Sequence, residues 1–302
     1  MEILANLING MSLGSVYAII ALGYTMVYGI AKMLNFAHGD VIMVGAYICF
    51  CSVSYLGLPP MLGVLLSVVG CTLLGIIVER LAYKPLRNAP SLNVLITAIG
   101  VSYFLQNAAL LIMGSDPKSF SSIISLPAIN LFDGSLTISA TAVITILACV
   151  VIMLALTTFT NKTKMGKAMR ACSEDREAAQ LMGINVNSTI SMVFAIGSGL
   201  AAIAGVLMCS AYPTLMPTTG SMPGIKAFTA AVFGGIGSIP GAALGGILLG
   251  IIEIFARAIL VRKCRCSCFC GSNCDFAHQT FWPSGQSSSR EGIGGEADEK
   301  TA

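Results

Sequence analysis

The sequence predicts an all-α membrane protein, a polytopic transmembrane helical bundle of about seven or eight spans. Of the 302 residues, 55% are hydrophobic and only 10% are charged, and the mean hydropathy is +0.83. A soluble domain carries about 25% charged residues, whereas a spanning helix needs roughly 20 consecutive apolar ones. Backbone polar groups find no partner in lipid, so spans must be helices or a closed barrel. The apolar runs lack the alternation of barrel strands, which leaves helices.

Six spans can be placed in order along the chain. Each is an apolar stretch between polar or Pro- and Gly-containing loops: residues 7–27, 41–56, 61–78, 94–113, 136–159 and 188–212. Pro59 and Pro60 mark a tight turn between the second and the third. A further apolar region, residues 227–252, is rich in glycine and broken at Ile239-Pro240. It is either one span preceded by a re-entrant half-helix or two short crossings.

Basic residues orient these spans. They cluster after the first, third and fifth spans: Lys32; Arg80, Lys84 and Arg87; and Lys162, Lys164, Lys167, Arg170 and Arg176. Loops rich in Lys and Arg stay on the cytoplasmic side. Because alternating spans put all three loops on one side, we expect the N-terminus outside and these loops in the cytoplasm. The opposite loops, residues 116–134 and 212–223, are poor in basic residues.

Small residues recur at a spacing of four in the last apolar region, at Gly237, Gly241 and Gly245. Such stripes let helix backbones approach closely in a membrane. We expect them to serve helix packing, and a role in opening a substrate path would use the same residues.

The expected cytoplasmic loop, residues 162–187, is predicted to contain a short amphipathic helix. Ser173 is a suitable N-cap, acidic residues follow it as the positive helix end favours, and Gly183 is a natural stop. Ala178, Leu181 and Met182 would form its apolar face. Such a helix either sits in a groove on a partner protein or rests on lipid headgroups.

Several motifs together resemble one protein family. They are Glu177-Ala178-Ala179 followed after three residues by Gly183, the flanking residues 164–171 and 181–185, and, elsewhere, residues 21–29, 35–40 and 226–241. Over about residues 1–260 the chain resembles the LivH-type permease subunit of bacterial ABC importers for branched-chain amino acids. The expected domains are therefore a permease domain, residues 1–260, and a separate tail, residues 261–302.

The resemblance implies a role for the loop and a set of partners. Glu177, Ala178, Ala179 and Gly183 would form the coupling helix that docks on ATP-binding subunits, where ATP and Mg²⁺ would bind, so that this chain needs no cofactor of its own. Accordingly, the sequence has no GxxxxGK[ST] phosphate loop. A second permease subunit, an extracytoplasmic solute-binding protein and the lipid of the bacterial inner membrane are the other expected partners, and no nucleic acid is expected.

Four polar residues are candidates for the substrate path: Asn35, His38, Asp40 and Lys226. Ionisable groups inside a membrane are costly unless paired or wetted. The alternatives are structural: a helix start with Asp40 near its N-terminus, and a re-entrant turn held by Lys226. The only other histidine is His278 and no Ser/His/Asp constellation occurs, so we expect neither a metal site nor catalytic residues.

Other functions remain open at this stage. A related ABC permease could carry urea, an amide or a sugar. An ion-coupled secondary amino acid transporter would need buried carboxylates within its spans, and only Glu253 qualifies. A membrane scaffold without transport activity is a third alternative.

The tail departs from the family pattern. Five cysteines crowd between Cys264 and Cys274 in Cys-x-Cys spacing, unlike the Cys-x₂₋₄-Cys pairs of structural zinc sites. Residues 265–286, back-translated with permitted codons and read one base later, can spell DAVVFAVAIVILLIKPSGLLGK, an apolar span with the ending expected of the family. We therefore expect that a frameshift replaced the final span by this tail.

Overall fold

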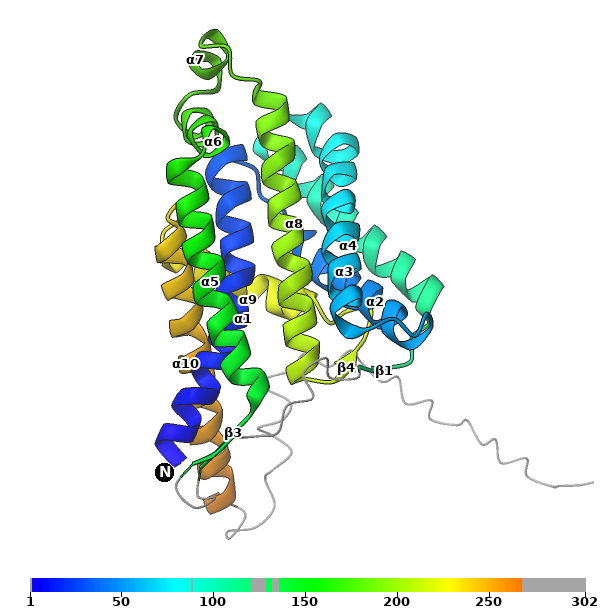
Figure 1. Ribbon diagram of the computed structural model, residues 1–302, viewed down its shortest axis with the longest axis vertical. Helices are drawn as coiled ribbons and strands as arrows, with labels where there is room; N and C mark the ends of the chain where they lie inside the picture. Colours follow the sequence, from blue (N-terminus) through cyan, green and yellow to red (C-terminus); the bar gives the residue numbers. More distant parts are fainter. Residues whose placement is uncertain (1, 88, 121–128, 132–135, 268–302) are drawn as a thin grey trace, which may run out of the picture. The chain divides into compact units, whose positions relative to one another are not determined.

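Helices make up almost all of the described chain, as the sequence predicts (Figure 1). The computed structural model describes residues 2–87, 89–120, 129–131 and 136–267, with side chains for residues 3–87, 89–120 and 138–259. The chain divides into two units, Met1–Phe255 and Ala256–Ala302. The first unit holds the whole bundle, and the described part of the second is the end of one helix. Most of the predicted tail, residues 261–302, lies outside the described residues.

The elements follow one another with short connections. The helices are α1 (Glu2–Ala31), α2 (His38–Ser54), α3 (Pro60–Val78), α4 (Ser91–Met113), α5 (Ala140–Lys162), α6 (Lys164–Glu174), α7 (Arg176–Leu181), α8 (Val186–Ala211), α9 (Ser221–Phe233) and α10 (Ile239–Ser267). A π-helical segment η1 (Glu79–Tyr83) and a 3₁₀ segment η2 (Lys84–Leu86) extend α3. Two small antiparallel pairs complete the described chain: β1 (Lys118–Ser119) with β4 (Thr214–Leu215), and β2 (Ile129–Leu131) with β3 (Leu136–Ile138).

Six of these helices are long and apolar enough to cross a membrane: residues 3–31, 60–86, 91–113, 140–162, 186–211 and 239–259. The predicted second span is present as the apolar helix α2, whose 17 residues, about 26 Å at 1.5 Å per residue, make it shorter than these six. It begins inside the bundle, where the centroid of the His38 ring lies 4.6 Å from that of the Tyr24 ring of α1, with the two rings tilted by 59°.

The apolar region 227–252 follows the first of its two predicted alternatives. Helix α9 has 13 residues, about 20 Å, and is too short to cross the membrane. A turn at residues 234–238 then leads into the long helix α10, which begins at the Ile239-Pro240 break. Proline is favoured in the first turn of a helix because no backbone donor is needed there.

Helix α8 lies at the centre of the bundle. Of its membrane window 83% is buried, against 22% for α3 and 11% for α4. Small residues let the other helices approach it: a side chain on Gly45 of α2 would lie 2.7 Å from the Cα of Ala202, and one on Gly205 would collide with the Ile42 carbonyl. Close backbone contact of this kind holds membrane helices together where no hydrophobic drive exists.

Glycines also join the first and the last helix. A Cβ on Gly14 would lie 2.7 Å from Ile247, and one on Gly246 would lie 2.5 Å from Ala18. Of the predicted stripe, Gly241 and Gly245 face backbone carbonyls of residues 234 and 230 around α9. The prediction that Gly237 belongs to this helical stripe was wrong, because Gly237 lies in the turn before α10 with φ +98°.

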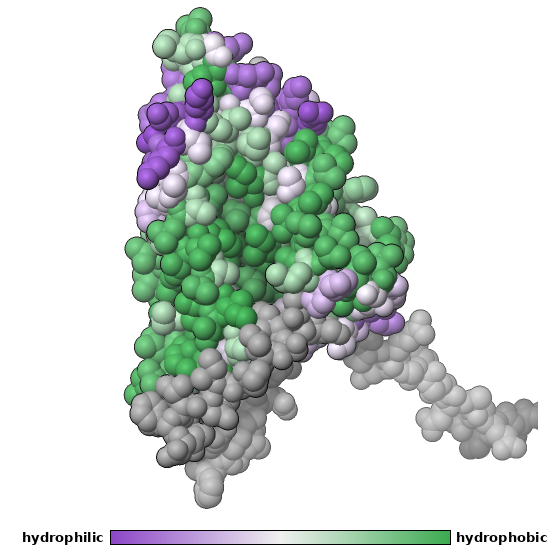
Figure 2. Space-filling model, in the orientation of Figure 1, coloured by the Kyte–Doolittle hydropathy of each residue, from purple (hydrophilic) through white to green (hydrophobic). Residues whose placement is uncertain are grey.

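The three basic loops converge at one end of the bundle. The Arg176 guanidinium donates to the Ala31 carbonyl, and Arg87 donates to the Asn187 side chain. The pairing of β1 with β4 joins two of the loops at the opposite end. Figure 2 shows hydrophilic residues gathered around α6 and α7, with a broad hydrophobic belt beyond them. This distribution fits a protein whose outer helices face lipid and whose basic end faces the cytoplasm.

Candidate functional site

The loop of residues 162–187 folds as two helices, α6 and α7, at one end of the bundle (Figure 1). Thr163 caps the first, α6, by accepting a hydrogen bond from the Gly166 amide at 2.9 Å. The buried side of α6 carries Gly166, Met169 and Cys172. A side chain on Gly166 would collide with the backbone of Thr160 in α5. This close approach fixes α6 against the end of the long helix that precedes it.

Asp175 separates α6 from α7 and caps the second helix. Its carboxylate Oδ1 accepts hydrogen bonds from the amides of Glu177 at 2.8 Å and Ala178 at 3.1 Å. The predicted N-cap, Ser173, is still within α6, and its hydroxyl donates to the Arg170 carbonyl. The prediction placed the cap two residues too early, because Ser and Asp are about equally good caps and only the extended backbone at Asp175, φ −146°, decides between them.

Gly183 ends α7 as predicted. Its φ of +83° lies in the left-handed region. The Gly183 amide donates to the Gln180 carbonyl and the Ile184 amide donates to the Ala179 carbonyl, both at 3.0 Å. These two bonds form a complete Schellman motif. A helix of six residues has little stability of its own, so the caps at both ends determine its shape.

The tip of α7 presents apolar side chains away from the bundle. Leu181 is 89% exposed and Met182 83% exposed, whereas Ala179 is buried. The predicted apolar face is thus present on Ala178, Leu181 and Met182, and Ala179 is the residue that faces inward. Large apolar side chains next to charged ones at a projecting tip are typical of a surface that another protein covers.

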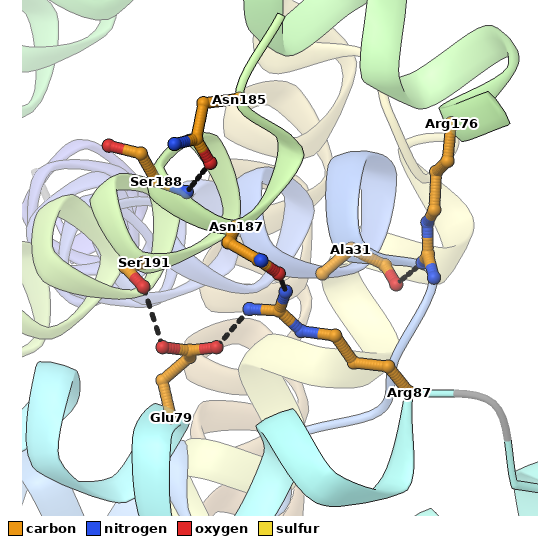
Figure 3. Close-up of polar contacts among 8 residues, drawn as sticks. All are labelled: Ala31, Glu79, Arg87, Arg176, Asn185, Asn187, Ser188 and Ser191. Carbon is orange, nitrogen blue, oxygen red and sulfur yellow. Dashed lines mark hydrogen bonds and ion pairs between the residues drawn. The ribbon is translucent and has the colours of Figure 1, made fainter. Parts of the chain in front are cut away.

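A buried ion pair lies beneath this tip (Figure 3). The Glu79 carboxylate is fully buried and pairs with Arg87, and the Ser191 hydroxyl donates to its other oxygen at 2.6 Å. Arg87 also donates to Asn187 in the first turn of α8. Glu79 opens the π-helical segment η1, and such segments often mark functional positions. The pair therefore fixes the end of α3 to the start of α8.

Arg176 makes the corresponding link between α7 and α1. It donates to the Ala31 carbonyl at the end of α1. Arg176 and Arg87 line an open cleft with Lys84 and Glu177. Burial, and then repulsion from Arg87, lower the pKa of the Arg176 guanidinium below its ordinary value. Cations held so close together favour acidic groups on whatever fills the cleft.

The predicted substrate-path residues belong to three separate sets of contacts. Asn35 accepts a hydrogen bond from the buried Tyr83 hydroxyl at 2.8 Å. Asp40 accepts one from Gln106 at 2.9 Å. Lys226 forms an ion pair with Glu253. His38 and Asp40 are each 1% exposed, so they lie inside the bundle, in the first turn of α2.

Sequence reasoning missed the partners of these residues. Tyr83, Gln106 and Glu253 come from η1, α4 and α10, and no spacing rule connects them to Asn35, Asp40 and Lys226, which they contact. The one available signal was a charged or amide side chain beside an apolar run, which marks a functional position in a membrane protein.

Comparison with known proteins identifies the family. Residues 6–265 match the family described as the permease component of branched-chain amino acid transport systems. The chain belongs to this family. It is 45% identical over 268 residues to the high-affinity branched-chain amino acid transport permease BraD of Pseudomonas aeruginosa, covering 85% of this chain and 87% of the relative. It is 44% identical over 275 residues to LivH of Escherichia coli K12, with the same coverage. The fructose import permease FrcC of Rhizobium meliloti is 28% identical, over 52% of this chain and 44% of the relative.

Proposed function

We propose that this chain is a transmembrane permease subunit of an ATP-binding cassette importer in the bacterial inner membrane and forms part of the path for branched-chain amino acids. The single observation that carries the proposal is the family match over residues 6–265, with 45% identity to a high-affinity branched-chain amino acid permease. The more distant similarity to a fructose permease covers half of the chain. It therefore gives less support to a sugar or another solute as cargo, and an ion-coupled transporter has no support among these relatives.

We propose further that α7 is the segment that docks on the ATP-binding subunits. Its exposed Leu181 and Met182 would enter an apolar groove, and acidic side chains of the partner would fill the cleft beside Arg176. Docking buries apolar surface that this chain leaves in water, so the contact is favourable without any change in the bundle. ATP and Mg²⁺ would bind to the partner, and this chain would carry no cofactor and catalyse no reaction.

Movement of α7 would reach the bundle through two links. Arg176 ties α7 to the end of α1. The short connection from Gly183 to α8 leads to Asn187, which Arg87 and Glu79 tie to α3. Helices α1, α3 and α8 would therefore move together when the ATP-binding subunits close. A solute-binding protein would deliver the amino acid at the opposite end, and a second permease subunit would complete the path.

Co-purification with the ATP-binding subunits tests the docking proposal. Leu181→Glu changes a side chain that is 89% exposed, so the fold should persist while the docking affinity falls at least tenfold, about 1.4 kcal/mol. Lys164→Glu, on the exposed side of α6, is the matched control and should dock normally. Equal retention of both variants on the ATP-binding subunits would exclude α7 as the docking element. Uptake of labelled leucine, compared with urea and fructose, by the reconstituted complex tests the cargo.

A further inference from the structure

An ion pair lies within the membrane part of the bundle, far along the chain from the cytoplasmic loop. The Lys226 ammonium of α9 lies 2.6 Å from Glu253 Oε1 of α10, and the Tyr17 hydroxyl of α1 donates to Oε2 at 3.0 Å. The Lys226 ammonium also lies 5.9 Å from the centroid of the Tyr17 ring. Tyr17 is the middle residue of the candidate span 3–31. Charge is rare here: between residues 188 and 252, Lys226 is the one Asp, Glu, Lys or Arg in the sequence.

This pair opens onto the surface of the bundle. The Lys226 side chain is 37% exposed and that of Glu253 is 15% exposed. Ionisable groups in membrane helices face the protein interior or a water-filled cavity and mark substrate pathways. The pair is more open than that of Arg87 and Glu79, whose side chains are 11% and 0% exposed. The exposure of Lys226 leaves its ammonium open to a ligand on this face of the chain.

The side chains around Lys226 are apolar. On α9, Met222 is 45% exposed and Ile225 is 52% exposed, and on α10 Ile252 is 63% exposed. Residues four apart on a helix share a face, so Met222 lies on the same side of α9 as Lys226. The surface therefore combines one cation, one carboxylate and a branched apolar surround.

We propose that Lys226 and Glu253 bind the two charged groups of the amino acid as it passes through the membrane. The inference rests on the proposed function. The Lys226 ammonium takes the substrate carboxylate, and the Glu253 carboxylate, oriented by Tyr17, takes the substrate ammonium. When the site is empty, the two residues neutralise each other; when the zwitterion enters, one ion pair is exchanged for two. The exchange leaves no buried charge without a partner, which would be costly. Met222, Ile225 and Ile252 contact the aliphatic side chain.

This chemistry selects the class of cargo. A zwitterion satisfies both residues, whereas urea or a sugar has no charge to offer and would leave the original pair closed. The site lies on one wall only, and the second permease subunit supplies the wall that faces it.

A charge-swap experiment tests the inference in the full complex, reconstituted with its ATP-binding subunits and saturated with leucine-loaded binding protein. Lys226→Met and Glu253→Gln should each lower the maximal rate of leucine uptake at least tenfold. The double variant K226E/E253K restores an ion pair, so it should recover the thermal stability of the complex while uptake stays low. Lys226→Arg, which keeps the cation, should retain most of the uptake.

Recovery of both stability and uptake in the swapped variant would show that the pair is a structural brace and would overturn the inference. Uptake at the wild-type rate in Lys226→Met would overturn it as well. If the wild-type complex carries another solute but not leucine, the proposed function itself is wrong. This outcome differs from those that contradict only the role of Lys226 and Glu253.

A second measurement leaves the ion pair intact. In Ile225→Cys the new thiol lies beside Lys226 on the exposed side of α9, and its labelling can be followed by mass spectrometry of the peptide that contains it. Leucine-loaded binding protein together with a non-hydrolysable ATP analogue should slow labelling at least fivefold relative to empty binding protein. Labelling at the same rate with and without leucine would place the substrate elsewhere.

Discussion

Asp175→Ala should loosen α7 without disturbing the bundle. The substitution removes the two hydrogen bonds, of 2.8 and 3.1 Å, that the carboxylate accepts from the amides of Glu177 and Ala178. Loss of an N-cap costs about 1 kcal/mol, which is about a fivefold change in an equilibrium constant. A helix of six residues cannot absorb this loss by its own propensity. The open form of α7 should therefore become about fivefold more populated.

Hydrogen exchange measures this effect directly, because amide protection reports local opening. Exchange of the amides in residues 177–184 should accelerate about fivefold in Asp175→Ala, while exchange in α8 stays as it is. Asp175→Asn should behave nearly like the wild type, since Asn is an equally good cap. In a complex that transports, a looser α7 should lower the uptake achieved per ATP hydrolysed.

Ser173→Ala is the matched control and the decisive one. Ser173 is the N-cap that the sequence suggests, whereas in the structure its hydroxyl donates to the Arg170 carbonyl within α6. Exchange in α7 should be unaffected by this variant. Faster exchange in Ser173→Ala than in Asp175→Ala would refute the structural assignment and restore the single-helix interpretation of the loop.

Four further outcomes are expected. Gly183→Ala should destabilise α7 by about 1 kcal/mol through backbone strain at φ +83°, since no atom lies within 4 Å of the added Cβ; the same exchange experiment measures it, and an unchanged rate would argue against the left-handed turn. Arg87→Ala should lower the stability in detergent by about 3–5 kcal/mol, because it leaves the fully buried Glu79 carboxylate without its partner; Arg87→Met combined with Glu79→Gln should cost less than the sum of the two single changes. Cys172 is 2% exposed and burial raises the pKa of its thiol, so it stays protonated at pH 8 and should react with maleimide far more slowly than a cysteine placed at residue 181; comparable rates would contradict the packing of α6. Finally, we propose that the reading frame shifts near residue 265, where the family match ends; sequencing the encoding DNA should show that a single-base change near codons 257–265 restores an apolar span, and a sequence that permits no such restoration would disprove the frameshift.

The sequence predicted the features that depend on composition or on one local signal. The long uncharged segments predicted the long helices, because lipid offers the backbone no hydrogen-bond partners and such segments must form helices to satisfy them. The basic residues of three loops predicted that these loops lie at the same end of the bundle. The contacts of Arg176 with Ala31 and of Arg87 with Asn187 confirm this. Gly183 was predictable because only a few residues tolerate the left-handed conformation that closes a helix.

Features that depend on distant contacts could not be predicted. Lys226 and Glu253 are 27 positions apart on different helices, and nothing in their spacing indicates a pair. The apolar side chains of α2 predicted the helix, but not that the structure buries most of them within the bundle and leaves few facing lipid. The cap of α7 could not be assigned from residue type, because Ser173 and Asp175 are about equally good caps. The backbone angle at Asp175 decides between them.

Helices α2 and α9 begin at the same point of the bundle. The first turn of α2 meets the first turn of α9 where Gly39 and Gly220 touch through their main chains, and a Cβ on either glycine would strike the other residue. With no side chain between them, the two main chains lie in direct contact, and a side chain at either position would force the two helix starts apart. Gln106 bridges the joint from α4, because its amide lies within hydrogen-bond distance of both Asp40 on α2 and Ser221 on α9. Because the two helix starts share this contact and the hydrogen bonds of Gln106, displacing one without the other would break both.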